Sequence, residues 1–179
     1  RLLDEIDAGK RILIEGAQAF GLDIDHGGYP NVTSSATTPA GALQGLGLPT
    51  TQEHDVIGVA KAYLTAVGTH NLPTKIEGEI AAKIQEKGHE YGATTGRRRD
   101  VAWLNIPELC RAARMTGCTR LALLKIDVLD GLQTVPVGVD IKKSGKVIYE
   151  NMLGWARTAG ITTFDALPQE AQNYVHFVE

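Results

Sequence analysis

The chain has 179 residues, of which 43% are apolar and 22% are charged. This composition is typical of a globular domain and excludes an intrinsically disordered chain or a coiled coil over the whole length. The 18 Lys and Arg residues against 21 Asp and Glu give a net charge of −3, which argues against a general nucleic-acid-binding protein. The sequence shows no signal-peptide pattern and no long apolar run, so we expect a cytoplasmic protein with no membrane partner.

Glycine is the one unusual component, with 20 residues, and it predicts loops with special backbone angles or close approach to a ligand. The two cysteines, Cys110 and Cys118, cannot form a disulfide framework or a zinc site alone, and we expect both to be ordinary buried small residues. The chain begins at Arg1 and stops at Glu179 after an apolar run. We therefore expect residues 1–179 to be a single fragment of a longer protein.

The first half of the chain shows several predicted elements. The apolar run 11–15 predicts a buried strand. Residues 16–51 are rich in Gly, Ser, Thr and Pro and predict a long functional loop, with a short helix over 40–46. Helical spacing of apolar residues predicts one helix over 56–67 and another from residue 76 that ends near Gly88.

The second half alternates between helices and strands. A glycine-rich loop over 91–99 precedes a predicted helix over 106–115, with Asn105 as N-cap and Gly117 as the residue after its end. Residues 120–128 predict a buried strand, 135–141 and 147–150 an antiparallel hairpin, and the segment after Pro168 a last helix. This order predicts an α/β fold.

Three adjacent arginines follow Thr94-Thr95-Gly96. Residues 83–120 hold eight Lys or Arg and four Asp or Glu, a local charge of 8 − 4 = +4 in a chain that is net negative. Arginine holds carboxylate or phosphate through two parallel hydrogen bonds, and loop amides add neutral donors. The loop is interpreted either as an anion-binding loop or as a solvated basic surface.

Two acidic patterns are also candidates. Lys125-Ile126-Asp127 resembles the end of the guanine-binding motif of GTP-binding proteins, where one carboxylate accepts from two guanine donors, although a surface ion pair would have the same sequence. Asp23 and Asp25, beside His26, would suit metal binding or acid–base chemistry, or the hydrogen bonding of loop N–H groups. The five histidines show no zinc-ligand spacing.

Taken together, these motifs resemble adenylosuccinate synthetase, in order and over essentially the whole chain. The segments that carry the resemblance are 15–18, 22–27, 29–35, 67–68, 90–99 and 124–132. The resemblance implies an α/β fold related to the P-loop NTPases, with a mostly parallel central sheet flanked by helices and an antiparallel hairpin. It also implies a GTP-dependent ligase of AMP biosynthesis that forms a C–N bond.

The family makes adenylosuccinate from IMP, L-aspartate and GTP with Mg²⁺. GTP phosphorylates the 6-oxygen of IMP, and the aspartate amine then displaces that phosphate. The family's acid and base residues, its phosphate loop and the expected Mg²⁺ ligands belong to an N-terminal part that these residues do not match. We therefore assign no catalytic residue and no metal ligand here, expect the isolated chain not to turn over, and expect a homodimer for the full-length protein.

The resemblance also implies roles for individual residues. Within an IMP-binding loop over 15–47, Gln18 would contact the IMP base and Thr33 the IMP phosphate, while Val67 would lie against the ribose. Arg97 would bind both IMP and aspartate, and Arg99 would reach toward GTP. The aspartate loop would comprise Ala93, Thr94, Thr95, Gly96, Arg97, Arg98 and Arg99, and guanine would be held by Lys125, Ile126 and Asp127.

Some positions depart from the usual family pattern. Residues 69–75 replace a segment that commonly ends in Thr-Glu, so that Lys75 stands in place of the glutamate, and Asp100 stands where a basic residue is usual. Residues 19–21 read Ala-Phe-Gly in place of a Gly-Thr-Leu type stretch. Two alternatives therefore stay open, namely a nucleotide-binding module without catalysis and a divergent relative that joins aspartate to another purine nucleotide.

Overall fold

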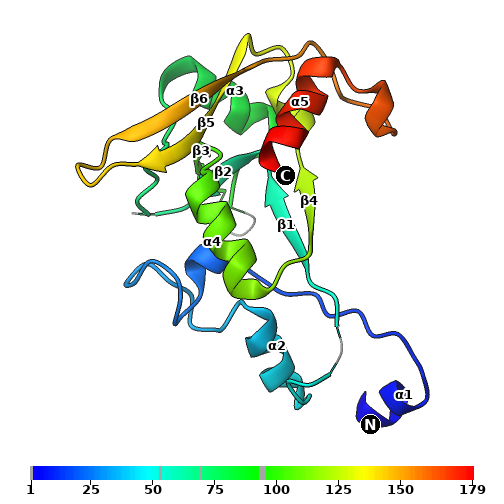
Figure 1. The fold of residues 1–179 in the computed structure, drawn as a ribbon. Helices are drawn as coiled ribbons and strands as arrows, with labels where there is room; N and C mark the ends of the chain where they lie inside the picture. The colour runs from blue at the N-terminus through cyan, green and yellow to red at the C-terminus, as the bar shows by residue number, and fades with distance from the viewer. Residues whose placement is uncertain (1, 53, 69, 93–95) are drawn as a thin grey trace. The chain divides into compact units, whose positions relative to one another are not determined.

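A computed structural model describes residues 2–52, 54–68, 70–92 and 96–179. The chain divides into two compact units, one formed by residues up to Val56 with Ala112–Thr119, the other by Ile57–Arg111 with Arg120–Glu179. Figure 1 shows the elements along the chain. None of the helices in the described ranges is long and apolar enough to span a bilayer.

The first unit contains α1 (Leu2–Asp7), the 3-10 helix η1 (Phe20–Leu22) and α2 (Pro39–Leu46). Helix α2 begins where the Thr38 hydroxyl accepts a hydrogen bond from the Gly41 N–H, and it ends at Gly47, which has a φ of 69°. Glycine adopts this left-handed conformation without steric cost. The predicted helix over 40–46 is confirmed.

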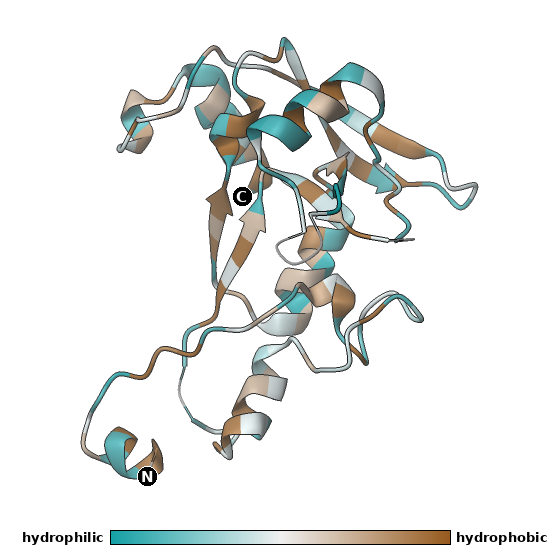
Figure 2. Ribbon diagram, turned by 180° about the vertical axis from the view of Figure 1, so that it is seen from behind, coloured by the Kyte–Doolittle hydropathy of each residue, from teal (hydrophilic) through white to brown (hydrophobic). Residues whose placement is uncertain are grey.

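The predicted strand over 11–15 is wrong. The segment is extended but pairs with no described strand, and Leu13 is 94% exposed. Figure 2 shows this apolar segment as an extended run outside regular structure. Apolar content predicts burial only when a neighbouring strand supplies hydrogen bonds to the backbone.

The second unit contains three strand pairs. Strands β1 (Ile57–Lys61) and β4 (Arg120–Leu124) are parallel, whereas β2 (Tyr63–Ala66) pairs antiparallel with β3 (Asp100–Trp103). Strands β5 (Thr134–Ile141) and β6 (Val147–Leu153) form the predicted antiparallel hairpin. Figure 2 shows hydrophobic residues along both strands of the β1–β4 pair.

The helices complete the α/β fold, which is confirmed. Helix α3 (Gly78–Lys87), α4 (Ile106–Thr116) and α5 (Gln169–Val178) occupy the predicted positions. Two 3-10 helices, η2 (Ile126–Leu129) and η3 (Phe164–Ala166), lie in the connections. Gly117, with a φ of 67°, follows the end of α4 as expected.

The predicted helix over 56–67 is wrong, because the segment forms β1 and β2. The spacing of Val56, Ala60, Tyr63 and Val67 fits a helix, but residues 57–61 pair with β4 and residues 63–66 pair with β3. The predicted buried strand over 120–128 is also only partly right. It ends at Leu124 because Lys125 adopts a φ of 59°, and both ends of β4 are exposed.

One smaller expectation is wrong and another holds only in part. Cys110 is exposed and Cys118 is half-buried, since Cys110 lies on the outer side of an amphipathic helix. Asn105 directly precedes α4 as expected, but it does not cap the helix through its side chain, because its buried Oδ1 has no hydrogen-bond partner among the described residues. Its backbone instead bridges to Gly138, and its carbonyl accepts from the Leu109 N–H.

The core of the second unit lies among β2, β3, β5, α3 and α5. Tyr174 of α5 is fully buried, and its hydroxyl donates to the Ala62 carbonyl at 2.7 Å. Its ring packs on Trp155 with the centroids 5.3 Å apart. The hydrogen bond from Tyr174 to Ala62 holds the short connection between β1 and β2 in place. Lys61 and Tyr63, on either side of Ala62, belong to the polar cluster of the candidate site.

Candidate functional site

A buried carboxylate, Glu90, gathers three cations in the second unit. Lys61 Nζ lies 2.8 Å from Glu90 Oε1 and 2.9 Å from Oε2, and Lys125 Nζ lies 3.0 Å from Oε1. An Arg99 guanidinium nitrogen donates to Oε2 at 3.1 Å, and the Tyr63 hydroxyl donates to Oε1 at 2.6 Å. We call these five residues the Glu90 cluster. Its formal charge is +2, since one carboxylate faces three cations.

Separate elements bring the cluster together. Lys61 ends β1 and Tyr63 begins β2, so the two side chains are held by the same tight connection. Glu90 follows α3, Arg99 directly precedes β3, and Lys125 follows β4. The left-handed backbone of Lys125, φ 59°, ends the strand, and its ammonium also donates to the Gly88 carbonyl. A non-glycine residue in this conformation persists only where its surroundings hold it.

Burial and hydrogen bonding together set the pKa values of these groups. Burial alone would raise the pKa of Glu90, but hydrogen bonds from Lys61, Tyr63 and Lys125 outweigh it and hold the pKa at about 2. Burial lowers the pKa of Lys61, although Glu90 opposes that change. Burial and the bond to Glu90 both raise the pKa of Tyr63. Glu90 is therefore ionised at neutral pH and Tyr63 stays a hydrogen-bond donor.

Acid should remove the stabilisation that Glu90 supplies. Because its pKa is about 2 in the folded protein against an ordinary 4.5, this contribution is present above pH 4.5 and is lost as the pH falls toward 2, by about 3 kcal/mol in all. Urea unfolding at steps between pH 6 and 2.5 measures it. Asp23 also titrates in acid, so the comparison is with Glu90→Gln, whose pH profile should be flatter. Parallel profiles would contradict the assignment.

Gly88 leaves room for the Tyr63 hydroxyl. A Cβ at this position would collide with that hydroxyl and lie 2.8 Å from the Ile84 carbonyl and 3.2 Å from Glu90 Cγ. We expect Gly88→Ala to lower the free energy of unfolding by about 1–3 kcal/mol through overpacking. Gly45→Ala is the control, because nothing lies within 4 Å there and alanine favours the helix. In urea titration, Gly88→Ala should lower the midpoint of unfolding and Gly45→Ala should raise it. Equal midpoints for the two variants would contradict the prediction.

The loop over 91–99, which we call the arginine loop, is closed by backbone hydrogen bonds. The Gly92 N–H donates to the Arg97 carbonyl at 2.8 Å, and the Arg99 N–H donates to the Glu90 carbonyl at 3.0 Å. Gln85 of α3 donates to the Arg99 carbonyl at 2.8 Å. Arg97 and Arg98 are exposed. The predicted aspartate-loop residues Ala93, Thr94 and Thr95 lie outside the described residues.

The predicted guanine motif lies across the turn after β4. Lys125 belongs to the Glu90 cluster, Ile126 packs against the core, and Asp127 is exposed in the first turn of η2. No described residue forms a hydrogen bond or ion pair with the Asp127 side chain. Asp130 fixes the end of this segment, since its Oδ1 accepts from Trp155 Nε1 at 2.9 Å and from the Thr158 hydroxyl at 2.7 Å.

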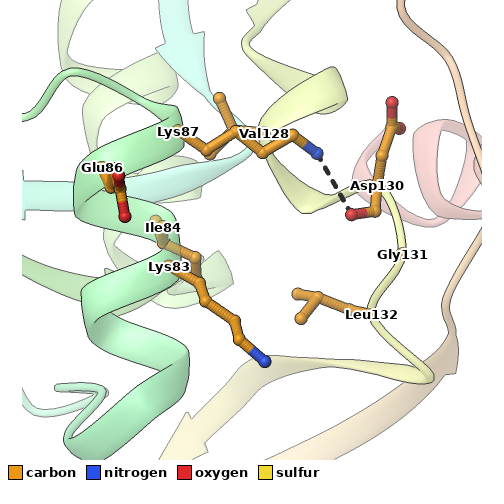
Figure 3. A pocket seen from close by; sticks show the side chains of 8 residues that line it. All are labelled: Lys83, Ile84, Glu86, Lys87, Val128, Asp130, Gly131 and Leu132. Carbon is orange, nitrogen blue, oxygen red and sulfur yellow. Dashed lines mark hydrogen bonds between the residues drawn. The ribbon is translucent and has the colours of Figure 1, made fainter.

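A cavity of about 300 Å³ lies between α3 and the segment 128–132. Figure 3 shows Lys83 and Lys87 extending from α3 toward it, with Lys87 Nζ donating to the Asp130 carbonyl at 3.1 Å. Neither Lys125 nor Asp127 lines this cavity. It therefore neighbours the predicted guanine motif without containing it.

The first unit holds the other predicted substrate residues. Gln18 is exposed and has a φ of 61°, a conformation that is costly for a residue with a side chain. Thr33 is half-buried, and its N–H donates to the Leu22 carbonyl at 2.8 Å. Val67, in the second unit, is 45% exposed. The structure thus leaves the Gln18 and Val67 side chains open to solvent.

Asp23 organises the loop that contains Thr33. Its carboxylate accepts from the N–H groups of Asp25 and His26, both at 3.0 Å, and of Thr37 at 2.6 Å. Burial would raise the pKa of Asp23, but these backbone donors hold it below its usual value. Of the two interpretations open from the sequence, loop-capping is confirmed for Asp23.

The described residues do not fit a Mg²⁺ site. No three His, Cys, Asp or Glu side chains come together in the ranges that the structure describes. The Asp23 carboxylate is already occupied by N–H groups, and Glu90 by cations.

Comparison with known proteins decides the family. The family model described as adenylosuccinate synthetase matches residues 1–179. The chain belongs to the adenylosuccinate synthetase family. An adenylosuccinate synthetase from Wolinella succinogenes is 45% identical over 191 residues, covering 99% of this chain and 46% of the relative. The chain thus spans about half the length of the curated relatives it matches.

Two solved structures resemble the chain. The fully ligated adenylosuccinate synthetase from Plasmodium falciparum has a TM-score of 0.94 and 36% identity, and covers 99% of this chain and 47% of its own. A cyanophage S-2L succinoaminodeoxyadenylate synthetase, bound to dGMP and dATP, has a TM-score of 0.52 and 24% identity over 60% of this chain and 33% of its own. The second likeness supports the fold alone.

Two residues predicted to depart from the family pattern form an ion pair in the structure. Lys75 Nζ lies 2.9 Å from Asp100 Oδ2, so that two positions expected from the sequence to depart from the family pattern form one ion pair. Both side chains are more than 40% exposed. We expect Lys75→Glu or Asp100→Arg alone to cost about 0.2–1 kcal/mol, and the double variant to recover it. Urea unfolding of the four proteins measures this coupling, and additive losses would contradict it.

Sequence reasoning missed Lys61, Tyr63 and Glu90. Glu90 begins one of the family motifs but had no assigned role, and Lys61 fell inside a predicted helix. The available signal was a lone lysine between apolar residues 56–60 and 62–64, because a charge in such a segment needs a partner. The structure brings Arg99 and Lys125 together through a residue that was not a candidate.

Proposed function

We propose that this chain supplies the IMP-, aspartate- and guanine-binding part of an enzyme that makes adenylosuccinate from IMP, L-aspartate and GTP. The observation that carries the proposal is the match over 99% of the chain to a fully ligated adenylosuccinate synthetase, with a TM-score of 0.94. The family match over 1–179 supports it. The cyanophage likeness covers less of the chain at lower identity, so it does not favour another purine substrate.

In this proposal, GTP phosphorylates the 6-oxygen of IMP and the aspartate amine displaces that phosphate. The chain's own residues bind and orient the reactants, which is the main requirement of phosphoryl transfer. Gln18 holds the IMP base, Thr33 its phosphate and Val67 its ribose. The exposed positions of Gln18 and Val67 are compatible with these roles.

The other two substrates meet the second unit. The loop over 93–99 binds aspartate, with Arg97 shared with IMP and Arg99 directed to GTP. Lys125 and Ile126 border the guanine, and Asp127 accepts from its ring N–H and exocyclic amine. The exposure of Asp127 at the start of η2 supports this assignment. No catalytic acid or base is assigned to these residues.

The proposal includes Mg²⁺ as cofactor, a homodimer and a cytoplasmic location. No three His, Cys, Asp or Glu side chains come together among the described residues, and in this proposal the Mg²⁺ ligands of the protein lie outside this chain. When bound, Mg²⁺ supplies charge neutralisation for the phosphates of GTP.

The direct test is a turnover assay of the intact gene product that contains this chain. With IMP, L-aspartate, GTP and Mg²⁺, adenylosuccinate should form, whereas the purified 179-residue chain alone should give none. Product from dGMP but not IMP would instead support a divergent relative. Nucleotide binding without any product from the intact protein would support a binding module, and turnover by the isolated chain would refute the assignment of catalytic groups elsewhere.

A further inference from the structure

We propose that Glu90 is a positioning residue for two substrates, because it holds Arg99 and Lys125 in the arrangement that binds aspartate and GTP. This inference rests on the proposed function, which places these two side chains at the aspartate loop and the guanine. It assigns to Glu90 a role through other residues and no contact of its own with a ligand.

The burial of Glu90 prevents its carboxylate from contacting a substrate directly. Its side chain is fully buried, and both carboxylate oxygens already accept hydrogen bonds from the other members of the Glu90 cluster. A carboxylate enclosed in this way cannot reach a substrate. It can still fix the donors that surround it, because hydrogen bonds to an ionised group are short and directional.

The cations that Glu90 holds come from separate segments. Arg99 directly precedes β3, whereas Lys125 follows β4 in a strained left-handed conformation. Lys61 and Lys125 share the same oxygen, Oε1, at 2.8 and 3.0 Å. Without the negative charge, these ammonium groups would repel at short range and separate. One side chain therefore sets the positions of both predicted binding groups.

The outer side of the Glu90 cluster remains available to a ligand. The side chains of Arg99 and Lys125 are 33% and 37% exposed, and a net charge of +2 is left after Glu90 is counted. The Arg99 guanidinium has further N–H donors beyond the one on Glu90. Groups with this charge and geometry bind phosphate or carboxylate, the chemistry of GTP and of aspartate.

If Glu90 only stabilised the fold, its substitution would change the Michaelis constants of all three substrates alike. If Glu90 positions Arg99 and Lys125, the substitution changes the Michaelis constants of GTP and aspartate but not that of IMP. Two of the predicted IMP contacts, Gln18 and Thr33, belong to the other unit. The other two, Val67 and Arg97, lie in the same unit as Glu90 but are not members of the Glu90 cluster. We therefore expect a selective change in the Michaelis constants of GTP and aspartate.

The test uses the intact gene product with Glu90→Gln, which keeps the shape and removes the charge, and Glu90→Asp, which keeps the charge. Glu86→Gln is the matched control, since Glu86 is an exposed glutamate of α3, four residues before Glu90. KM for each substrate, kcat and the dissociation constant of GTP are measured for all four proteins, together with Tm. Glu90→Gln should raise KM for GTP and for aspartate about tenfold, leave KM for IMP within about twofold, and be partly rescued in Glu90→Asp.

Equal increases in all three KM values, or none despite a lower Tm, would overturn the proposal. Turnover by the wild-type protein judges the proposed function separately. If the wild type makes no product but binds GTP, the GTP dissociation constant decides, with about tenfold weakening in Glu90→Gln supporting the role and unchanged binding overturning it. If the wild type does not bind GTP, both proposals fall.

Discussion

Glu90→Ala is expected to lower the free energy of unfolding by about 3–5 kcal/mol, because it leaves three cations without their shared carboxylate. The Tyr63 hydroxyl, fully buried, also loses its acceptor. The isosteric Glu90→Gln keeps an acceptor for this hydroxyl and should cost less. The free energy is measured by urea unfolding of the intact gene product near neutral pH.

The control for this loss is Glu86→Ala, an exposed truncation four residues earlier, which should change the free energy of unfolding by less than about 0.5 kcal/mol. A second substitution that removes one of the cations should restore part of the lost unfolding free energy. Removing one cation as well, in Glu90→Ala with Lys61→Met, should recover part of the loss, since the remaining repulsion falls. A loss below about 1 kcal/mol for Glu90→Ala would contradict the assignment of Glu90 as the centre of the cluster.

Asp127→Asn is expected to reduce the preference for GTP over ITP by about 10- to 100-fold, the value of one hydrogen bond to a charged acceptor. ITP lacks the exocyclic amine, so it cannot lose a bond that it never made. Asp127 is exposed and forms no hydrogen bond or ion pair with a described residue, and therefore its carboxylate is available to a base. The kcat/KM values for both nucleotides, measured in the wild type and the variant, give the change.

Asp165→Asn is the matched control for Asp127, because Asp165 is also an exposed aspartate in the first turn of a 3-10 helix. It should leave the GTP to ITP ratio unchanged. Equal losses of kcat/KM for GTP and ITP in Asp127→Asn would remove the side chain from recognition of the exocyclic amine, whereas a larger loss for GTP than for ITP supports it, because both nucleotides carry the ring N–H and only GTP carries the amine.

Elements with a clear period and a defined end could be predicted from the sequence. Helices α2 and α4 each end at a glycine with positive φ, Gly47 and Gly117. The β5–β6 hairpin turns at a Lys-Ser-Gly-Lys segment. In each case the local preference agrees with the tertiary structure, which is the condition under which single-sequence patterns work.

The failures come from residues whose partners are distant in the sequence. The spacing of Val56, Ala60 and Val67 suits a helix as well as two short strands, and only pairing with β4 and β3 decides. Lys61 and Glu90 are 29 positions apart, and Lys125 and Glu90 are 35 apart. No local pattern reports such contacts, so the cluster that joins two predicted binding motifs was not foreseen.

The predicted site residues were assigned from family motifs and not from the local periodicity that predicted the helices and the hairpin. Their roles came from the family motifs and stay predictions, with Arg99 and Lys125 brought together by the structure and Ala93, Thr94 and Thr95 outside the described residues. Family membership itself is shown by the match over the whole chain.

The central claim is that this chain serves a ligase in which GTP phosphorylates the 6-oxygen of IMP and the aspartate amine then displaces that phosphate. The most direct test is a single turnover of the intact gene product with IMP labelled with heavy oxygen at the 6-position. We expect the inorganic phosphate released to carry the heavy oxygen, because the phosphate leaves with the 6-oxygen. Unlabelled phosphate formed together with adenylosuccinate would contradict the account.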